Sequence, residues 1–229
     1  MIIISFSGLD GCGKSTHVAL TRRYVEEAGL RARELATLSI SATGVLARLR
    51  EARARRRARR SPSTVNSAPL LRGYAGGRSF DQDRRHWSVH LRRMLIYPLD
   101  CVVLRLYLAW LSLMGYDAVV CDRYTYDKMV GLPLPTGRLS RLMLWLVPRP
   151  ALAVFLEVAP QIAAVRKPEH HADYYVTKDE AYLQLVEWRC GLRAIPSESI
   201  RETQEEIQSA IDPIIAAYTR RAHRPCSIS

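Results

Sequence analysis

The hydrophobic pattern alternates between short apolar runs and longer segments with apolar residues three or four positions apart. The short runs predict buried strands at residues 2–6, 32–38, 117–121, 152–158 and 192–195. The longer segments predict helices at residues 14–28, 40–60, 86–114, 138–147, 177–189 and 198–221. Strands that alternate with helices in this way predict an α/β fold, in which helices cover both faces of a parallel sheet.

Glycine and proline residues mark the expected ends and bends of these elements. Gly29 and Gly115 each follow a predicted helix, where glycine is a common stop signal. Pro98 lies within the predicted helix 86–114 and is expected to bend it. Residues 61–80 are rich in Ser, Pro and Gly and predict a loop.

The length and composition of the chain fit a single domain over residues 1–229. Apolar residues make up 48% and charged residues 24%, which is typical of a globular protein with a buried core. Much of the net charge of +12 comes from residues 48–60, where eight Arg and one Glu give +7. We expect an Arg-rich insertion at about residues 40–85. Its alanine spacing and lack of aromatic residues favour an exposed helix over the alternative, a surface that binds nucleic acid.

Neither a disulfide framework nor a membrane span is expected. The five cysteines are scattered, odd in number and without a CxxC pair, which fits a reducing cytoplasm. The longest apolar stretch, residues 94–116, contains Asp100 and Arg105. Because charged residues are costly inside a bilayer, this stretch predicts a buried helix and no membrane partner.

Residues 8–16, GLDGCGKST, match the phosphate-loop pattern GxxxxGK[ST] at every fixed position. Gly8, Gly11 and Gly13 let the backbone curl so that successive N–H groups face phosphate oxygens. Lys14 is expected to reach the β- and γ-phosphates, and the Ser15 hydroxyl to ligate Mg²⁺. Since the motif follows a predicted strand and opens a predicted helix, the sequence predicts a site for a nucleoside triphosphate with magnesium.

An acidic residue follows the third apolar run, in the sequence VVCDRY at residues 119–124. Ligands of open parallel sheets bind beyond the carboxyl ends of the strands, where Asp122 can hold magnesium or orient an acceptor. Arg123 is then expected to face phosphate, which a planar guanidinium binds well. The alternative for the pair is a salt bridge that caps the strand.

A cationic segment follows the fourth apolar run, at about residues 159–176. Arg166 and Lys167 are the cations that a closing lid could place over a transferring phosphate, with Arg166 preferred. The alternative is a solvated loop.

These elements, in this order, resemble the thymidylate kinase family of nucleoside monophosphate kinases. GLDGCGKST resembles the phosphate loop of that family, CDRY its DR[YF] element, and LEVAPQIAAVRKPE its strand and lid. The tail AIPSESIRETQEEIQSAI at residues 194–211 is similar to its last strand and helix. The resemblance covers most of the chain except about residues 40–90. It implies a three-layer P-loop NTPase fold with a five-stranded parallel sheet between helices.

The resemblance also implies ATP as phosphate donor, Mg²⁺ as its metal and a nucleoside monophosphate as acceptor. Arg123 would hold the acceptor phosphate with help from Asp122, and Asp10 would lie near the acceptor. Because residue 11 is Gly and not Arg, the catalytic cation is expected from the lid, at Arg166. The residues expected at ATP and its magnesium are Gly8, Asp10, Gly11, Cys12, Gly13, Lys14, Ser15 and Thr16, together with Asp122.

Two stretches depart from the pattern of the family. The family usually has an Asp-Arg pair on the long helix, and its Arg helps to bind the monophosphate. Here the pair is Asp100-Cys101, so Arg105, one turn further on, is the candidate substitute. After the DR[YF] element the family has a Ser-rich stretch that helps to recognise thymine, whereas residues 125–130 read TYDKMV.

Three functions therefore remain open from the sequence. The leading hypothesis is a nucleotide kinase with Lys14, Asp122 and Arg166 as catalytic residues and dTMP as the first acceptor to try. The second keeps the chemistry but uses another nucleotide or a phosphorylated metabolite. The third is a nucleotide-dependent regulatory module whose Arg-rich segment contacts nucleic acid or another partner. A homodimer is possible in each case.

Overall fold

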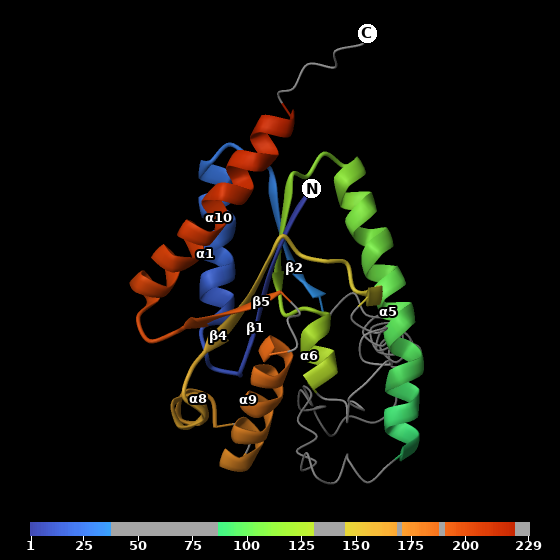
Figure 1. Ribbon diagram of the computed structural model, residues 1–229, viewed down its shortest axis with the longest axis vertical. Coiled ribbons are helices and arrows are strands. Elements are labelled where there is room, and N and C mark those ends of the chain that lie inside the picture. The colour runs from blue at the N-terminus through green and yellow to red at the C-terminus, as the bar shows by residue number, and fades with distance from the viewer. Residues whose placement is uncertain (38–86, 131–144, 169–170, 188–190, 223–229) are drawn as a thin grey trace, which may run out of the picture.

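The computed structural model describes residues 1–37, 87–130, 145–168, 171–187 and 191–222 (Figure 1). The predicted Arg-rich helix 40–60, the loop 61–80 and most of the predicted helix 138–147 lie outside the described residues. The strands are β1 (Ile2–Gly8), β2 (Ala32–Ala36), β3 (Ala118–Asp122), β4 (Leu152–Glu157) and β5 (Leu192–Pro196). The helices are α1 (Lys14–Glu27), α5 (Trp87–Leu113), α6 (Thr125–Val130), α8 (Pro160–Arg166), α9 (Ala172–Glu187) and α10 (Ile200–Ala222).

The strands form a five-stranded sheet in the order β2-β3-β1-β4-β5, and every neighbouring pair is parallel. The predicted parallel α/β fold is confirmed. The chain places β2 and β3 on one side of β1, and then crosses β1 to place β4 and β5 on its other side. The order therefore reverses at β1, and the carboxyl end of this strand is where such sheets bind ligands.

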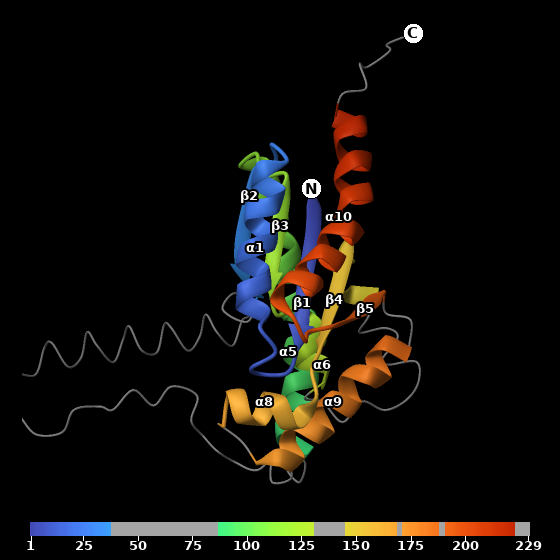
Figure 2. The same cartoon turned by 90° about the vertical axis from the view of Figure 1, so that its left-hand side faces the viewer.

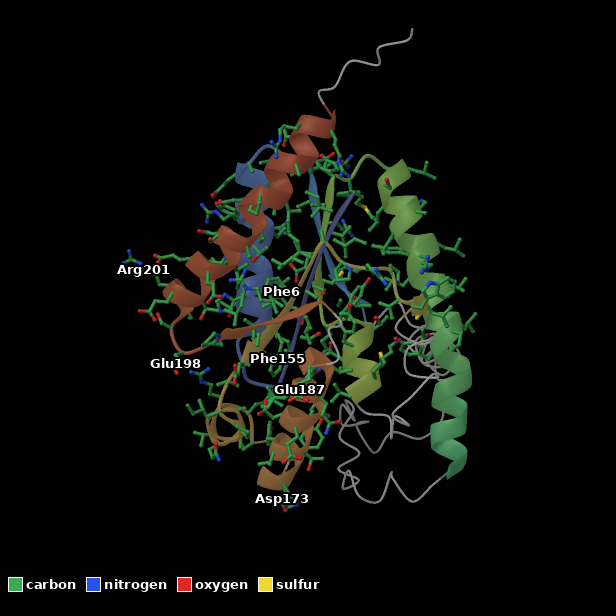
Figure 3. All side chains as sticks on the ribbon, in the orientation of Figure 1. Phe6, Phe155, Asp173, Glu187, Glu198 and Arg201 are labelled. Carbon is green, nitrogen blue, oxygen red and sulfur yellow. The ribbon has the colours of Figure 1, made fainter. Side chains whose placement is uncertain are left out.

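Helices cover both faces of the sheet, as the apolar pattern predicts (Figure 1). Helices α1 and α10 lie on one face and α5 on the other, while α8 and α9 lie near the end where β1 and β4 finish (Figures 1 and 2). Figure 3 shows Phe6 and Phe155 between these layers, and both side chains are fully buried. Phe155 stacks on Tyr182 of α9, with ring centroids 5.0 Å apart, so the core itself holds α9 against β4.

The observed boundaries correct some of the predicted ones. Helix α9 begins at Ala172, five residues before the predicted start. The segment expected to form the lid is not an extended loop, because residues 160–166 form the short helix α8, with Pro160 in its first turn. Helix α6 was not predicted, since six residues are too few to show a helical period. Gly29 and Gly115 have φ angles of 82° and 78°, which confirms the predicted helix stops.

Helix α5 contains residues Ile96–Leu113, a stretch long and apolar enough to cross a membrane by length and composition alone. One of its faces packs on the core through side chains that include Tyr97 and Leu104. Asp100 on the same helix is buried and pairs with Lys128 at 2.6 Å. One face of α5 therefore packs on the core, but only 33% of this stretch is buried, less than the buried helix that the sequence predicts.

Candidate functional site

The loop between β1 and α1 has the backbone that its glycines allow. Gly8, Gly11 and Gly13 have φ angles of 148°, 91° and 89°, a region that side chains with a Cβ rarely enter. A Cβ on Gly8 would also lie 2.8 Å from the Leu156 carbonyl oxygen and 2.9 Å from Cys12 Sγ. The loop therefore curls as predicted from the phosphate-loop pattern, and glycine is required for it.

Lys14 folds back over this loop. Its side chain is buried, and Nζ donates to the carbonyl oxygens of Gly8 at 3.0 Å and Leu9 at 2.5 Å. Nζ also lies 3.6 Å from the sulfur of Cys12, whose burial raises the pKa of the thiol and keeps it neutral. The ammonium is thus held within the curl of the loop, where the sequence predicts the phosphates of ATP.

Ser197, from the segment between β5 and α10, supports the loop from outside. Its hydroxyl donates to the Cys12 carbonyl oxygen at 2.9 Å. The next turn of the loop opens α1, where the Thr16 backbone N–H donates to Gly13 at 3.1 Å and the Thr16 side chain is exposed.

The side chains of Ser15 and Asp122 meet beside the loop. Ser15 Oγ donates to Asp122 Oδ2 at 3.0 Å, although the two residues are 107 positions apart. A hydroxyl and a carboxylate are the hard oxygen ligands that Mg²⁺ prefers, and such sites use one or two carboxylates together with phosphate oxygens. The two residues therefore fit the metal that the sequence predicts for them.

Arg123 has a φ of 64° and is the non-glycine residue with positive φ in the described part of the chain. This backbone costs energy for a bulky residue, and neighbouring contacts hold it in place. The Arg123 backbone N–H donates to the Phe6 carbonyl oxygen of β1 at 3.0 Å, and the guanidinium pairs with Asp10. The strained turn therefore directs the guanidinium back to the phosphate loop.

Asp127 ties three elements to this turn and was missed by the sequence analysis. Its carboxylate accepts hydrogen bonds from Ser7 at 2.8 Å, from the Tyr182 hydroxyl at 2.5 Å and from the Tyr124 backbone N–H at 2.9 Å. It also lies 3.7 Å from the Arg123 guanidinium. Strand β1, helix α9 and helix α6 are thereby joined around one buried carboxylate.

Asp10 lies inside a cluster of cations. Burial raises the pKa of Asp10, but Lys178, Arg123 and Lys14 more than offset this and lower that pKa to about 2. Lys178 Nζ, from α9, is 3.5 Å from Asp10 Oδ2. The sequence analysis missed Lys178, although its position four residues before the buried Tyr182 puts both on one face of α9.

The end of α8 packs directly on the phosphate loop. A Cβ on Gly11 would lie 3.0 Å from the Ala163 carbonyl oxygen and 3.3 Å from Arg166 Cβ. The structure thus brings Arg166 to the loop, with its side chain exposed. The segment predicted as a lid lies where a cation could reach a bound phosphate.

Arg105 is not brought into this cluster. Its side chain is exposed on α5, and Nε donates to the Leu146 carbonyl oxygen at 3.2 Å. The neighbouring Cys101 is buried, and burial raises the pKa of its thiol to about 11. Within the described residues, no hydrogen bond or ion pair joins Arg105 to Asp10 or Arg123.

The depressed pKa of Asp10 predicts a pH-dependent contribution to stability. The folded-state value of about 2 lies below the ordinary value of 3.8, so the contribution is complete above pH 4 and is lost as the pH falls toward 2. We expect Asp10→Asn to lower the free energy of unfolding at pH 7 by about 2 kcal/mol. The difference from wild type should shrink between pH 4 and pH 2.5 in urea titrations. A difference independent of pH would show that the Asp10 charge is not responsible.

No family model matches this chain. A thymidylate kinase of Symbiobacterium thermophilum is 26% identical over 237 residues, covering 96% of this chain and 97% of the relative. A probable thymidylate kinase of Methanothermobacter thermautotrophicus is 25% identical over 219 residues, covering 92% of this chain and 94% of the relative. Together with the parallel sheet and the phosphate loop, these full-length similarities support the interpretation that the chain is a divergent member of the thymidylate kinase family.

Proposed function

We propose that this chain is an ATP-dependent nucleotide kinase that transfers the γ-phosphoryl group of ATP to a nucleoside monophosphate, with dTMP as the first acceptor to test. The observation that carries the proposal is that two separate pairs of polar groups meet at one glycine loop. Ser15 donates to Asp122, while Arg123 pairs with Asp10. Such a pair of sites suits a donor with magnesium and an acceptor with a phosphate. The names of both relatives agree with this reading.

On the donor side, the residues of the chain bind and orient the triphosphate. Loop N–H groups and Lys14 bind its phosphates, with Lys14 exchanging carbonyl oxygens of Gly8 and Leu9 for phosphate oxygens. Ser15 and Asp122 would hold Mg²⁺, which supplies charge neutralisation at the phosphates when it is bound.

On the acceptor side, Arg123 is the residue for a phosphate. Its guanidinium has acidic partners, so its pKa is raised despite desolvation and it remains a cation. A phosphate dianion is a stronger partner than a carboxylate for a planar guanidinium, and it accepts two parallel hydrogen bonds. Arg166, at the end of α8 beside Gly11, would add positive charge where charge develops during transfer.

A different acceptor is the second candidate, and helix α6 favours it. This helix occupies the stretch where the resemblance implies thymine recognition. Thr125, Tyr126, Met129 and Val130 on it are buried, so they face the core. The acidic residue of this helix, Asp127, already accepts three hydrogen bonds. The acceptor base must therefore be read by other residues, and another nucleotide or a phosphorylated metabolite fits as well.

The predicted homodimer, the cytoplasmic location and the absence of nucleic-acid and membrane partners stay predictions. Helix α5 exposes apolar side chains at Leu99, Val102, Leu106 and Trp110. In the predicted homodimer, a second copy of the chain would cover these side chains.

The proposal predicts ADP release that depends on both an acceptor and Lys14. A coupled ADP-release assay with ATP and Mg²⁺ should respond to one or more members of a panel of nucleoside monophosphates and phosphorylated metabolites. Lys14→Ala should abolish that response while the thermal unfolding temperature stays near wild type, because losing a positioned cation costs several kcal/mol, on the order of a thousandfold in rate. A folded Lys14→Ala protein that works at the wild-type rate would contradict the assignment. Salt-sensitive nucleic-acid binding without transfer to any acceptor would favour the regulatory module instead.

Arg123→Ala is expected to impair the acceptor and spare the donor. Loss of a charge-assisted contact from a partly buried site should lower kcat/KM for the acceptor by roughly 2–4 kcal/mol, while Mg·ADP affinity changes little. Steady-state kinetics and calorimetry on the same protein measure both effects. Arg201→Ala is the matched control, because Arg201 pairs with Glu205 on the exposed surface of α10 and its side chain points outward (Figure 3). Lost Mg·ADP binding with unchanged acceptor kinetics would place Arg123 on the donor side.

A further inference from the structure

Lys178 is a buried cation of α9 with weak pairing. Its residue exposure is 8%, and Nζ lies 3.5 Å from Asp10 Oδ2 and 3.2 Å from the Tyr174 hydroxyl. An ammonium has three N–H donors, and a buried one is costly unless its partners compensate for lost water. The ammonium also lies over the Tyr174 ring, 5.2 Å from its centroid. Among these described contacts Asp10 is the anionic partner, at long range, so Lys178 retains capacity for a further anion.

A structural ion pair in the same chain looks different. Lys128 Nζ lies 2.6 Å from Asp100 Oδ2, so one ammonium and one carboxylate neutralise each other at short range. Lys178 is 3.5 Å from Asp10 Oδ2, and Arg123 pairs with the other oxygen of the same carboxylate. Two cations therefore share one carboxylate.

The charges around Asp10 indicate which kind of ligand could bind there. Three cations act on the Asp10 carboxylate, namely Lys14, Arg123 and Lys178, and Asp127 adds a second carboxylate 3.7 Å from Arg123. Asp122 is turned to Ser15 instead. The cluster therefore has surplus positive charge beside a loop whose own N–H groups attract anions.

We propose that Lys178 is a second cation of the acceptor site and that it binds the acceptor phosphate together with Arg123. The inference rests on the proposed function and adds a residue to the same site. The Asp10 carboxylate contacts both Arg123 and Lys178. A phosphate dianion has enough oxygens and charge to bind both cations. Lys178 is buried beside Asp10, whereas Arg105 is exposed on α5 and donates to Leu146.

The test compares ligands with and without the phosphate. Calorimetry with wild type, Lys178→Met and Lys178→Arg uses dTMP, thymidine and Mg·ADP as probes; if another monophosphate gives the fastest ADP release, that compound and its nucleoside replace dTMP and thymidine. Lys178→Met should weaken dTMP binding about ten- to a hundredfold, the loss expected for a charge-assisted contact. Thymidine and Mg·ADP should change less than about twofold, and Lys178→Arg should recover most of the dTMP affinity.

Repeating the test in an Asp10→Asn protein distinguishes a lysine that binds phosphate from a lysine that only neutralises Asp10. In Asp10→Asn, Lys178 has no carboxylate to neutralise, so a purely structural lysine becomes dispensable. If Lys178 binds phosphate, Lys178→Met still weakens dTMP binding in that background by at least about tenfold. The double variant also buries no uncompensated Asp10 charge, so it remains informative if Lys178→Met alone does not fold. Lys128→Met is the control for losing a lysine that pairs with a buried carboxylate, and we expect it to lower stability and preserve dTMP affinity.

Distinct results overturn the inference and the proposed function. Wild-type phosphoryl transfer with unchanged dTMP affinity in Lys178→Met would overturn the inference alone. Equal losses for dTMP and thymidine, or no loss in the Asp10→Asn background, would do the same by assigning Lys178 a structural role. A wild-type protein that transfers phosphate to no acceptor would overturn both.

Discussion

The parallel pairing of β1 with β3 determines where the polar groups of the site meet. In this register Phe6 lies opposite Asp122, so β3 ends next to the start of the phosphate loop. A shift of one residue would turn Asp122 to the other face of the sheet and remove its contact with Ser15. The same register brings the Arg123 backbone N–H to the Phe6 carbonyl oxygen. Both sides of the proposed site therefore depend on one strand pairing.

Buried charge is the second constraint on this part of the molecule. Asp10, Arg123 and Lys178 are largely withdrawn from water, and each would be costly alone. Their mutual contacts, and the Asp127 carboxylate 3.7 Å from Arg123, offset that cost. The offset is incomplete where two cations share Asp10. A site of this kind gives up some stability in the free protein and becomes well matched to a phosphate.

Local sequence patterns predicted the parts of the fold and site that local chemistry determines. The glycine loop, the five strands and the position of Asp122 at a strand end all follow from residue types within a few positions. Tyr182 and Lys178 could not be predicted in this way, because only the packing of α9 against the sheet brings them to the loop. Asp127 could not be predicted either, because its partner Ser7 is 120 positions away in the sequence. Arg105 shows the converse. Its position one turn after Cys101 suggested a substitute cation, but the rotation of α5 exposes its side chain.

The central claim is that a donor nucleotide and an acceptor nucleotide bind beside the loop at the same time, and calorimetry tests this directly. Mg·ADP should be titrated into the wild-type protein alone and again in the presence of a saturating accepted nucleoside monophosphate, followed by the reverse titration. If Ser15 and Asp122 serve one ligand and Arg123 and Asp10 the other, each ligand will bind with one site per chain in the presence of its partner. Mutually exclusive binding would mean that the loop serves a single anion site and would contradict the account.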